Sequence, residues 1–562
     1  TQDESGEDWH YAHCNLYEAG EHVGYITVGY LGYQNWEFNE PGYCWSSELD
    51  NSWIEYHYEL ETFENRRGPQ RGAIARQDLD GELVWIKPFL PGAFYSVIQD
   101  HEGNIVAVGE GGSNREFPDM DPVEIRYNEN DAGDIDISDP GMDCAALGYF
   151  AAKMTVVKID PNGNMLWYTM IGADEQWDQA WSRRGIAQDV VEVDQSGTWS
   201  YYVAGWSEVN GSSGNKGVLG RVAADGSLIS RHVYASGDAA FLGVPSMQSD
   251  PAEQIRFMAI DVTEVGGSDL LAISGHARRA SPSPFPELAF CMQLDLTDAD
   301  PYLPEFVIST DGLPQHDASL IQHTTGVGYA TVDGTPKIIW PTLADYSLGD
   351  IFAGQSAANL VVHLLDPTTG TADWTTNLGE VRAYDLQAEA IQTSDDHIAV
   401  VSSKWAQYPF GYAQLSAVAQ QCLEDFHSFQ GHDWENANEL NYWNTDAYVA
   451  KLDETTGAVI WETQFDSDPG EGRECFPGNV KKQECMYNIT EADEGGLVVS
   501  GNTSGNFDDN YLVKLQPDCQ SRADYSIYHG MDEYDPYTNT YTADIGTTLW
   551  LVDMNVHGIV RI

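Results

Sequence analysis

Short apolar stretches with the alternation typical of β-strands recur along this chain, and many lead through a polar turn into a second apolar stretch. The recurring phrase is a strand, then Asp-x-x-Gly or a close variant, then a strand that often carries Trp. A glycine in a tight turn supplies the positive φ that a hairpin needs, and a neighbouring Asp or Asn bonds its own backbone. The pattern therefore predicts a repeated β-hairpin. Its clear copies are Ala75–Trp85, Val157–Trp167 and Ala450–Trp461, and its weaker copies are Leu365–Trp374 and Arg221–Ile229.

A second phrase, a β-rich strand that often ends in Gly, precedes most of these hairpins, and another strand lies before it. Copies include Asn104–Gly109, Ser200–Gly205 and Gly496–Gly501. Each repeat therefore holds four short strands, which we name a, b, c and d in chain order. Such repeats predict an all-β fold, a seven-bladed β-propeller over residues 1–530, with eight blades or a two-domain split as alternatives. The seven repeats start near His10, Ala93, Arg184, Arg256, Ile321, Tyr384 and Met486.

Long connections are concentrated on one face of the predicted propeller. In each blade the b–c and d–a connections emerge at one end, and the a–b and c–d turns emerge at the other. The long b–c connections are 34–71, 112–149 and 406–446, and the long d–a links are 172–183, 235–253 and 467–484. Binding residues are often carried by loops on a rigid scaffold, so we expect the function at this face.

The last part of the chain departs from the repeat. Residues 531–562 predict a polar linker followed by a C-terminal β segment. This segment is either the start of a further domain or a strand that pairs with a neighbouring subunit.

The chain is strongly acidic, with 88 Asp and Glu against 27 Lys and Arg, and a net charge of −61. Nucleic acids and anionic lipids need basic contacts to their phosphates, so we expect neither as a partner. No run of about 20 apolar residues occurs, so no transmembrane segment is expected. The excess charge has two interpretations: a surface solvated in a salty medium, or carboxylates that gather Ca²⁺.

Two kinds of candidate site lie in or beside the long connections. Carboxylates alternate through one insertion, where they could hold Ca²⁺ or form a solvated acidic loop. These candidate metal ligands are Asp119, Asp121, Asp134, Asp136 and Asp139. Aromatic side chains could stack on a ligand, anchor a protein partner or pack against one another. These candidate binding residues are Trp36, Trp45, Trp53, Trp177, Trp181, Trp405, Tyr408, Trp434 and Trp443.

The eight cysteines include no CxxC motif, so zinc-ribbon, thioredoxin and c-type haem sites are not expected. In an exported protein, loop cysteines predict disulfides. Cys475 and Cys485 flank one loop and are the favoured pair, whereas Cys291 lies in a strand-like segment and is expected to be a buried free thiol. The others are Cys14, Cys44 and Cys144, which could supply a second pair, and Cys422 and Cys519, which stay unassigned.

The phrases Asp446–Asp453 and Glu494–Gly501 resemble the blades of secreted β-propeller proteins of Bacteroidota-type bacteria. The resemblance covers roughly residues 20–530 and implies a propeller outside the cell or on its outer surface. Proteins of that family commonly end in a sorting domain for type 9 secretion, and residues 550–562 look like the strand that often precedes it. Thr368–Trp374 and Thr455–Trp461 are also similar to the tryptophan-docking motif of PQQ-dependent quinoproteins, although the adjacent-cysteine pair of those enzymes is missing.

No catalytic motif such as Gly-x-Ser-x-Gly, His-Glu-x-x-His or a Walker loop occurs in the sequence. The sequence therefore predicts a non-catalytic, exported β-propeller that binds an extracellular protein or polysaccharide. Two alternatives stay open. One is a structural subunit of an extracellular filament or surface assembly, and the other is a propeller hydrolase or quinoprotein.

Overall fold

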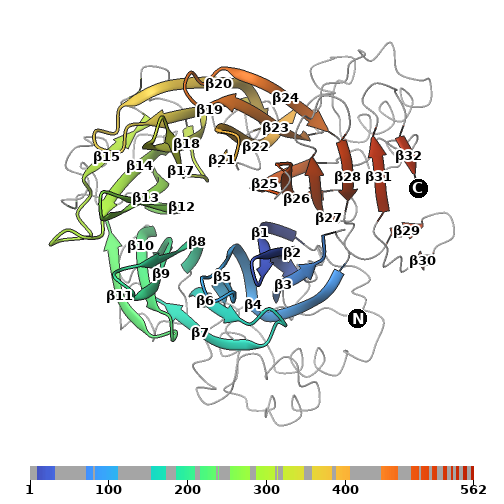
Figure 1. The fold of residues 1–562 in the computed structure, drawn as a ribbon, viewed down its shortest axis with the longest axis horizontal. Helices are drawn as coiled ribbons and strands as arrows, with labels where there is room; N and C mark the ends of the chain where they lie inside the picture. The colour runs from blue at the N-terminus through green and yellow to red at the C-terminus, as the bar shows by residue number, and fades with distance from the viewer. Residues whose placement is uncertain are drawn as a thin grey trace, which may run out of the picture. The chain divides into compact units, whose positions relative to one another are not determined.

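A computed structural model shows a chain of β-strands grouped into blades (Figure 1), and the chain divides into two compact units. The first consists of Thr1–Asp238, Ser249–Ile260 and His529–Gly546, and the second of Ala239–Gln248, Asp261–Tyr528 and Thr547–Ile562. The structure describes residues 9–31, 71–79, 83–111, 153–172, 185–208, 215–235, 238, 254–278, 287–310, 313, 321–346, 357–382, 388–405, 445–465, 483–492, 495–504, 509–515, 523–527, 533–535, 540–542, 548–552 and 559–561.

The described elements are β-strands, and most belong to antiparallel blades with the order a-b-c-d. Blade 1 consists of β1 (Trp9–Glu18), β2 (Glu21–Leu31), β3 (Arg71–Gln77) and the start of β4 (Leu83–Gln99). Blade 2 consists of the rest of β4, β5 (Ile105–Gly111), β6 (Lys153–Ile159) and β7 (Met165–Ile171). Blade 3 consists of β8 (Gly185–Asp194), β9 (Trp199–Glu208), β10 (Asn215–Ala223) and β11 (Leu228–Tyr234).

Three further blades follow in chain order. Blade 4 consists of β12 (Gln254–Val265), which contributes to both units, β13 (Ser268–Arg278), β14 (Glu287–Asp295) and β15 (Phe306–Ser309). Blade 5 consists of β17 (Gly328–Val332), β18 (Thr335–Tyr346), β19 (Ala357–Leu365) and β20 (Ala372–Arg382), and β16 (Ile321–His323) also pairs with β18. Blade 6 consists of β21 (Glu389–Thr393), β22 (His397–Trp405), β23 (Thr445–Asp453) and β24 (Val459–Phe465).

The described part of the chain forms six four-stranded blades, so the predictions of seven blades and of eight are both wrong. The repeat predicted from Met486 supplies three strands, which join the sheet of blade 6 through a β23–β25 pairing. They are β25 (Gln483–Glu491), β26 (Leu497–Ser504) and β27 (Asp509–Leu515). The next strand along the chain, β28 (Ala523–Ile527), pairs with β31 (Thr548–Val552), and β31 pairs with β32 (Ile559–Arg561). β29 (Glu533–Asp535) and β30 (Thr540–Thr542) form a separate hairpin.

The first two blades share the long strand β4. Its residues up to Pro91 pair with β3, and its residues from Gly92 onward pair with β5. Apolar side chains of both blades meet in one core, which includes Ile26 and Ile74 of blade 1 and Phe94 and Ile105 of blade 2. The strand therefore ends one blade and begins the next without a connecting loop.

A β-bulge interrupts strand a at an equivalent place in several repeats. In β4 the extra residue is Tyr95, and the residue before it, Phe94, pairs with Gly109 of strand b. Phe94 and Val97 therefore reach the same core although they are three positions apart. A Cβ on Gly109 would lie only 1.9 Å from the carbonyl oxygen of Ala93, so the bulge requires glycine at that position. Equivalent bulge residues and glycines are Tyr11 with Gly29, Gln188 with Gly205, and Tyr487 with Gly501.

The recurrent Trp of strand d packs on the c–d turn of the following blade. In the first unit Trp167 Nε1 donates to the Ala224 carbonyl at 3.0 Å. In the second unit Trp374 Nε1 donates to the Glu454 carbonyl at 2.8 Å. The turn glycine under this ring, Gly457, has φ +69°, and a Cβ there would lie 2.6 Å from Trp374. The turns at Gly226 and Gly457 thus shape their own hairpins and receive an aromatic ring from the preceding blade.

Carboxylates on strand a tie neighbouring blades together. In the first unit Asp189 accepts hydrogen bonds from Ser96 Oγ at 2.6 Å and from the Ile260 backbone N–H at 2.9 Å. Asp189 therefore joins β4, β8 and β12. In the second unit Asp261 accepts from the Tyr329 backbone N–H at 2.7 Å, and Glu389 accepts from that of Ile489 at 3.1 Å.

We expect Asp189 to make the stability of the protein depend on pH. Burial raises the pKa of its carboxyl to about 6, while hydrogen bonds from Ser96, Ile260 and Val190 act in the opposite direction. The folded-state pKa lies above the unfolded value, so this stabilisation is complete below pH about 4 and is lost as the pH rises through about 6. Between pH 4 and pH 7, wild type should lose on the order of 3 kcal/mol relative to Asp189→Asn. Urea unfolding of both proteins across this range measures the difference, and parallel curves would contradict the expectation.

Candidate functional site

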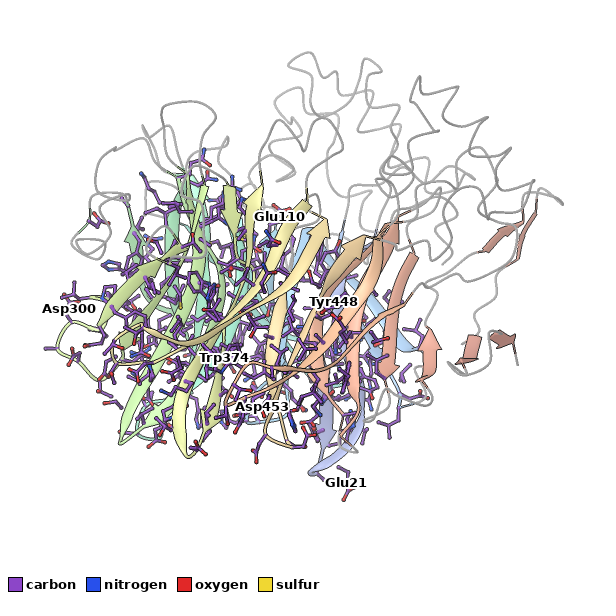
Figure 2. All side chains as sticks on the ribbon, turned by 90° about the horizontal axis from the view of Figure 1, so that it is seen from above. Glu21, Glu110, Asp300, Trp374, Tyr448 and Asp453 are labelled. Atoms are coloured by element: carbon purple, nitrogen blue, oxygen red, sulfur yellow. The ribbon has the colours of Figure 1, made fainter. Side chains whose placement is uncertain are left out.

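The long b–c connections begin and end at paired residues. Leu31 pairs with Arg71, Gly111 with Lys153, and Trp405 with Thr445, so each connection leaves from and returns to adjacent strand ends. We call this end of a blade the b–c end. In the first unit, Figure 2 shows Glu110 near this end and Glu21, the first residue of β2 after the short a–b turn, at the opposite end. In the second unit, Tyr448 lies near the start of β23 and Asp453 lies at its tight-turn end (Figure 2).

Three side chains meet at the b–c end of blades 1 and 2. The rings of Tyr11 and Tyr95, the two bulge residues, lie with their centroids 4.7 Å apart and their planes tilted by 42°. The Tyr95 hydroxyl donates to Glu110 Oε1 at 3.1 Å. Glu110 is buried, whereas both tyrosines are half-buried. The arrangement combines two aromatic faces with an oriented carboxylate, which we call the tyrosine wedge.

The same end of blade 3 holds a second aromatic residue with a charged neighbour. The Arg256 guanidinium lies 4.7 Å from the centroid of the Trp206 ring, within the range of a cation–π interaction. Trp206 is buried, and its strand neighbour Ser207 is buried as well. The chain therefore places an arginine on an aromatic face at this end of the first unit.

In the second unit the b–c end of blade 4 carries a pair of histidines. The ring of His276, on β13, stacks on that of His323, on β16, with centroids 4.6 Å apart and planes 7° from parallel. His276 is buried. Polar and aromatic groups thus lie at the b–c ends in both units.

The tight-turn ends of the blades carry ion pairs that serve the fold. Lys158 Nζ lies 2.8 Å from Asp100 Oδ2 and 2.9 Å from Glu102 Oε2, and Tyr201 donates to Asp100 at 2.8 Å. Although burial lowers the pKa of Lys158, its hydrogen bonds to Asp100, Glu102 and Tyr201 raise it overall. In blade 6, Lys451 makes an equivalent contact of 2.6 Å with Asp395. These basic side chains are held by acidic residues of the a–b turns.

Most of the predicted site residues lie outside the described residues. Trp405 is the last residue of β22, and Cys485 lies on β25. The others are Trp36, Trp45, Trp53, Trp177, Trp181, Tyr408, Trp434, Trp443, Asp119, Asp121, Asp134, Asp136, Asp139 and Cys475. The aromatic face, the calcium site and the Cys475–Cys485 disulfide therefore stay predictions.

Two cysteines can be assigned. Cys291 is a buried free thiol, as predicted. Cys14 is also a free thiol, so the suggestion that it pairs with Cys44 or Cys144 is wrong. Burial raises the pKa of Cys14 to about 12, against a hydrogen bond with the Gln99 backbone. Its thiol therefore stays protonated, and poorly nucleophilic, at neutral pH.

Metal and membrane features were sought in the same described ranges. These ranges contain no group of three or more His, Cys, Asp or Glu side chains arranged to hold a metal ion. They also contain no helix with the length and apolar character needed to cross a bilayer.

The blades and their turns define the chain as a β-propeller with four-stranded blades. No family model and no curated protein matches it. It is similar to a solved structure named the Dos1 propeller, with 9% identity over 94% of this chain and 92% of the other, at a TM-score of 0.35. It is also similar to the NanB sialidase of Streptococcus pneumoniae, with 9% identity over 71% and 66% and a TM-score of 0.38.

A third similar structure is the quinohemoprotein alcohol dehydrogenase of Comamonas testosteroni. The identity is 10%, the match covers 77% of this chain and 53% of that one, and the TM-score is 0.25. The assignment of the fold rests on the blade topology itself.

The tyrosine wedge was missed by the sequence analysis, which looked for binding aromatics in and beside the long connections. The available signal was the strand-ending glycine. Gly29 and Gly109 each face a bulge, and the bulge residue is a tyrosine in both cases. A bulge can re-aim a side chain out of the normal alternation, and bulges are frequent next to functional sites.

Proposed function

We propose that the chain is an exported β-propeller that binds an extracellular protein or polysaccharide through the b–c ends of its blades. The observation that supports this is the contrast between the two ends of a blade. Long connections occur at one end, and short hydrogen-bonded turns occur at the other. Rigid scaffolds commonly carry their binding residues in this way.

The acidic composition is consistent with a function outside the cell. A net charge of −61 keeps the chain soluble and disfavours anionic partners such as nucleic acids. Several basic side chains in the described residues, such as Lys158 and Lys451, are paired with carboxylates within their own blades. We therefore expect the partner to be neutral or basic.

The proposal can be tested by shortening the long connections one at a time. Because Gly111 pairs with Lys153, residues 112–152 can be replaced by Asn-Gly, which closes a two-residue hairpin between adjacent strands. The same design fits residues 32–70 and 406–444. At least one replacement should reduce binding to glycan arrays or to intact cells of the source organism by about tenfold or more, the effect of losing about 1.4 kcal/mol.

A control at the tight-turn end separates binding from folding. Pro161→Ala changes the Asp160–Gly163 turn without touching a b–c end, and it should leave binding unchanged. All variants should keep the β-sheet circular dichroism of wild type. If the three shortened proteins fold and bind as wild type does, the proposal is wrong. Breakdown of an array glycan by wild type would favour the hydrolase alternative.

A further inference from the structure

We propose that the outer edge of blades 2 and 3 carries a second interaction surface, which binds a protein segment that combines apolar side chains with lysine or arginine. We call this surface the blade 2–3 rim. Its residues are Leu166, Asp225, Leu228 and Ile229, all in the first unit and all exposed. The rim lies at the tight-turn ends of the blades, so this inference goes beyond the proposed function, which concerns the b–c ends.

A second β-bulge recurs in strand d, shortly after the c–d turn. In β7 the pairing with β6 skips Leu166, which is therefore the extra residue. In β11 the pairing with β10 skips Ile229. A bulge removes its extra residue from the normal alternation of faces. The extra residues at the same place in other blades are Val84 in blade 1, Asp373 in blade 5 and Ile460 in blade 6.

The fold does not require an apolar residue at this bulge. In blade 5 the position holds Asp373, whose side chain is 42% exposed and lies 2.7 Å from Lys337 Nζ. A charged residue is therefore compatible with the bulge. At the other four bulges the residue is aliphatic, with an exposed fraction between 43% for Ile460 and 52% for Val84. An exposed aliphatic side chain forgoes the free energy that burial would give, and a contact with a partner would recover it.

The junction between blades 2 and 3 gathers exposed aliphatic residues from both blades. β7 and β11 are the outer strands of their blades (Figure 1). Trp167, the residue after Leu166, packs on the c–d turn of blade 3 and donates from Nε1 to the Ala224 carbonyl at 3.0 Å. The same turn leads directly into Leu228 and Ile229 of β11. Aliphatic residues of two blades therefore flank one exposed turn.

Asp225 gives this turn a negative charge. Its Oδ1 accepts hydrogen bonds from Ser227 Oγ at 2.7 Å and from the Ser227 backbone N–H at 3.0 Å. These bonds lower the pKa of the Asp225 carboxyl below its usual range, so it is ionised at neutral pH. Both bonds use the same oxygen, and the second oxygen can accept a hydrogen bond from an ammonium or guanidinium group.

The arginines of the two outer strands of blade 3 are engaged elsewhere in the first unit. Arg221 donates to Ser200 Oγ at 3.1 Å, and Arg231 donates to the Gly172 carbonyl at 3.0 Å. Among the described residues, Asp225 makes no ion pair. The rim therefore presents a carboxylate without a counter-charge between two aliphatic surfaces.

The charge of the chain selects the occupant of the rim. Two copies of the chain, each with a net charge of −61, repel each other, which disfavours a contact between two rims. An anionic lipid surface is disfavoured for the same reason. A basic segment is attracted by Asp225 and by the chain as a whole, and its apolar side chains can cover Leu166 and Ile229. This complementarity assigns the rim to a basic, apolar protein segment.

The test uses the full chain with labelled leucine and isoleucine methyl groups and three capped peptides. The first is acetyl-Gly-Lys-Leu-Lys-Leu-Gly-amide, the second has serine in place of leucine, and the third has glutamate in place of lysine. In methyl NMR spectra the first peptide should shift the resonances of Leu166 and Ile229. Its affinity should be at least about fivefold above that of either other peptide.

Variants of the rim identify the groups that bind. Leu166→Ser and Ile229→Ser should each weaken binding of the first peptide by roughly threefold to tenfold. Asp225→Asn, which keeps an acceptor oxygen for the turn, should weaken it by about twofold to fivefold and should reduce its dependence on salt. Leu303→Ser is the matched control, because it removes an exposed leucine from the c–d turn of blade 4 and should bind as wild type does. All four variants should keep the urea midpoint of wild type, since the substituted side chains are exposed.

Equal affinity for the first and second peptides would overturn the inference, as would equal or tighter binding of the third. It would also be overturned by unshifted Leu166 and Ile229 resonances, or by a loss in Leu303→Ser as large as that in Leu166→Ser. Concentration-dependent sedimentation of wild type that Leu166→Ser abolishes would assign the rim to a second copy of the chain instead. None of these results bears on the b–c ends, whose function is tested by the shortened connections.

Discussion

Gly109→Ala is expected to destabilise the protein by about 3 kcal/mol or more, because the new Cβ would clash with backbone atoms of the neighbouring strand. At 1.9 Å from the Ala93 carbonyl oxygen and 2.7 Å from the Phe94 Cα, the methyl group can be accommodated only by moving strand β4. The urea midpoint of the variant, compared with wild type, measures the effect. Gly205→Ala, which faces the equivalent bulge of blade 3 with a Cβ 2.1 Å from the Ile186 oxygen, should behave in the same way.

Gly197→Ala is the matched control for this prediction. Gly197 has φ +83°, but a Cβ there would meet nothing within 4 Å, so only the left-handed backbone conformation is penalised, at about 1–2 kcal/mol. If Gly109→Ala proves no more harmful than Gly197→Ala, the bulge does not depend on its glycine. The requirement described for the b-strand glycines would then be wrong.

Lys158→Met should cost about 3–5 kcal/mol, because it leaves a buried carboxylate without its counter-charge. The Lys158 side chain is 3% exposed and that of Asp100 is 0% exposed. Asp100 also accepts backbone hydrogen bonds from Glu102 and Asn104, so it cannot turn toward solvent without breaking its own turn. Urea unfolding near pH 7 measures the loss.

The corresponding lysine of blade 6 provides a control. Lys451 contacts Asp395, whose side chain is 54% exposed, so Lys451→Met should cost only about 0–1 kcal/mol for the ion pair itself. Lys158→Met combined with Asp100→Asn should recover part of the stability lost in the single variant. Equal losses in Lys158→Met and Lys451→Met would show that burial of Asp100 does not govern the effect.

The hairpins could be predicted from the sequence because they depend on local chemistry. The turn in Val157–Trp167 is set by Asp160, which accepts from the backbone N–H groups of Asn162 and Asn164. The energetic difference between Lys158 and Lys451 could not be predicted in this way. Both lie in a Lys-x-Asp phrase, and they differ in the burial of a carboxylate more than 50 positions earlier in the chain.

The number of blades could not be predicted from local sequence patterns, for a related reason. Residues 523–527 carry a strand pattern and do form a strand, but β28 pairs with β31. The unpaired N–H and C=O groups of an edge strand can bond to any strand that lies beside them. Which strand pairs with β28 is therefore decided by the tertiary structure. Four strand signals in a repeat therefore do not ensure a four-stranded blade.

The tyrosine wedge depends on register. A strand with strict alternation would direct Phe94 and Val97 to opposite faces, and Tyr95 would then be an ordinary member of one of them. The bulge changes these assignments, and it becomes visible only when Phe94 is found opposite Gly109. Once this pairing is known, a glycine at the end of strand b becomes a marker for a re-aimed residue on strand a.

The unbroken course of β4 from Leu83 to Gln99 bears on how this protein can be cut or rearranged. New termini, split sites and fusion points are usually placed between structural repeats, yet a break at residue 91 would sever a hydrogen-bonded strand. A fragment that starts at Leu83 would leave the first half of β4 without its partner β3. Engineers should therefore treat residues 83–99 as indivisible and open the chain within a long b–c connection such as 112–152 instead.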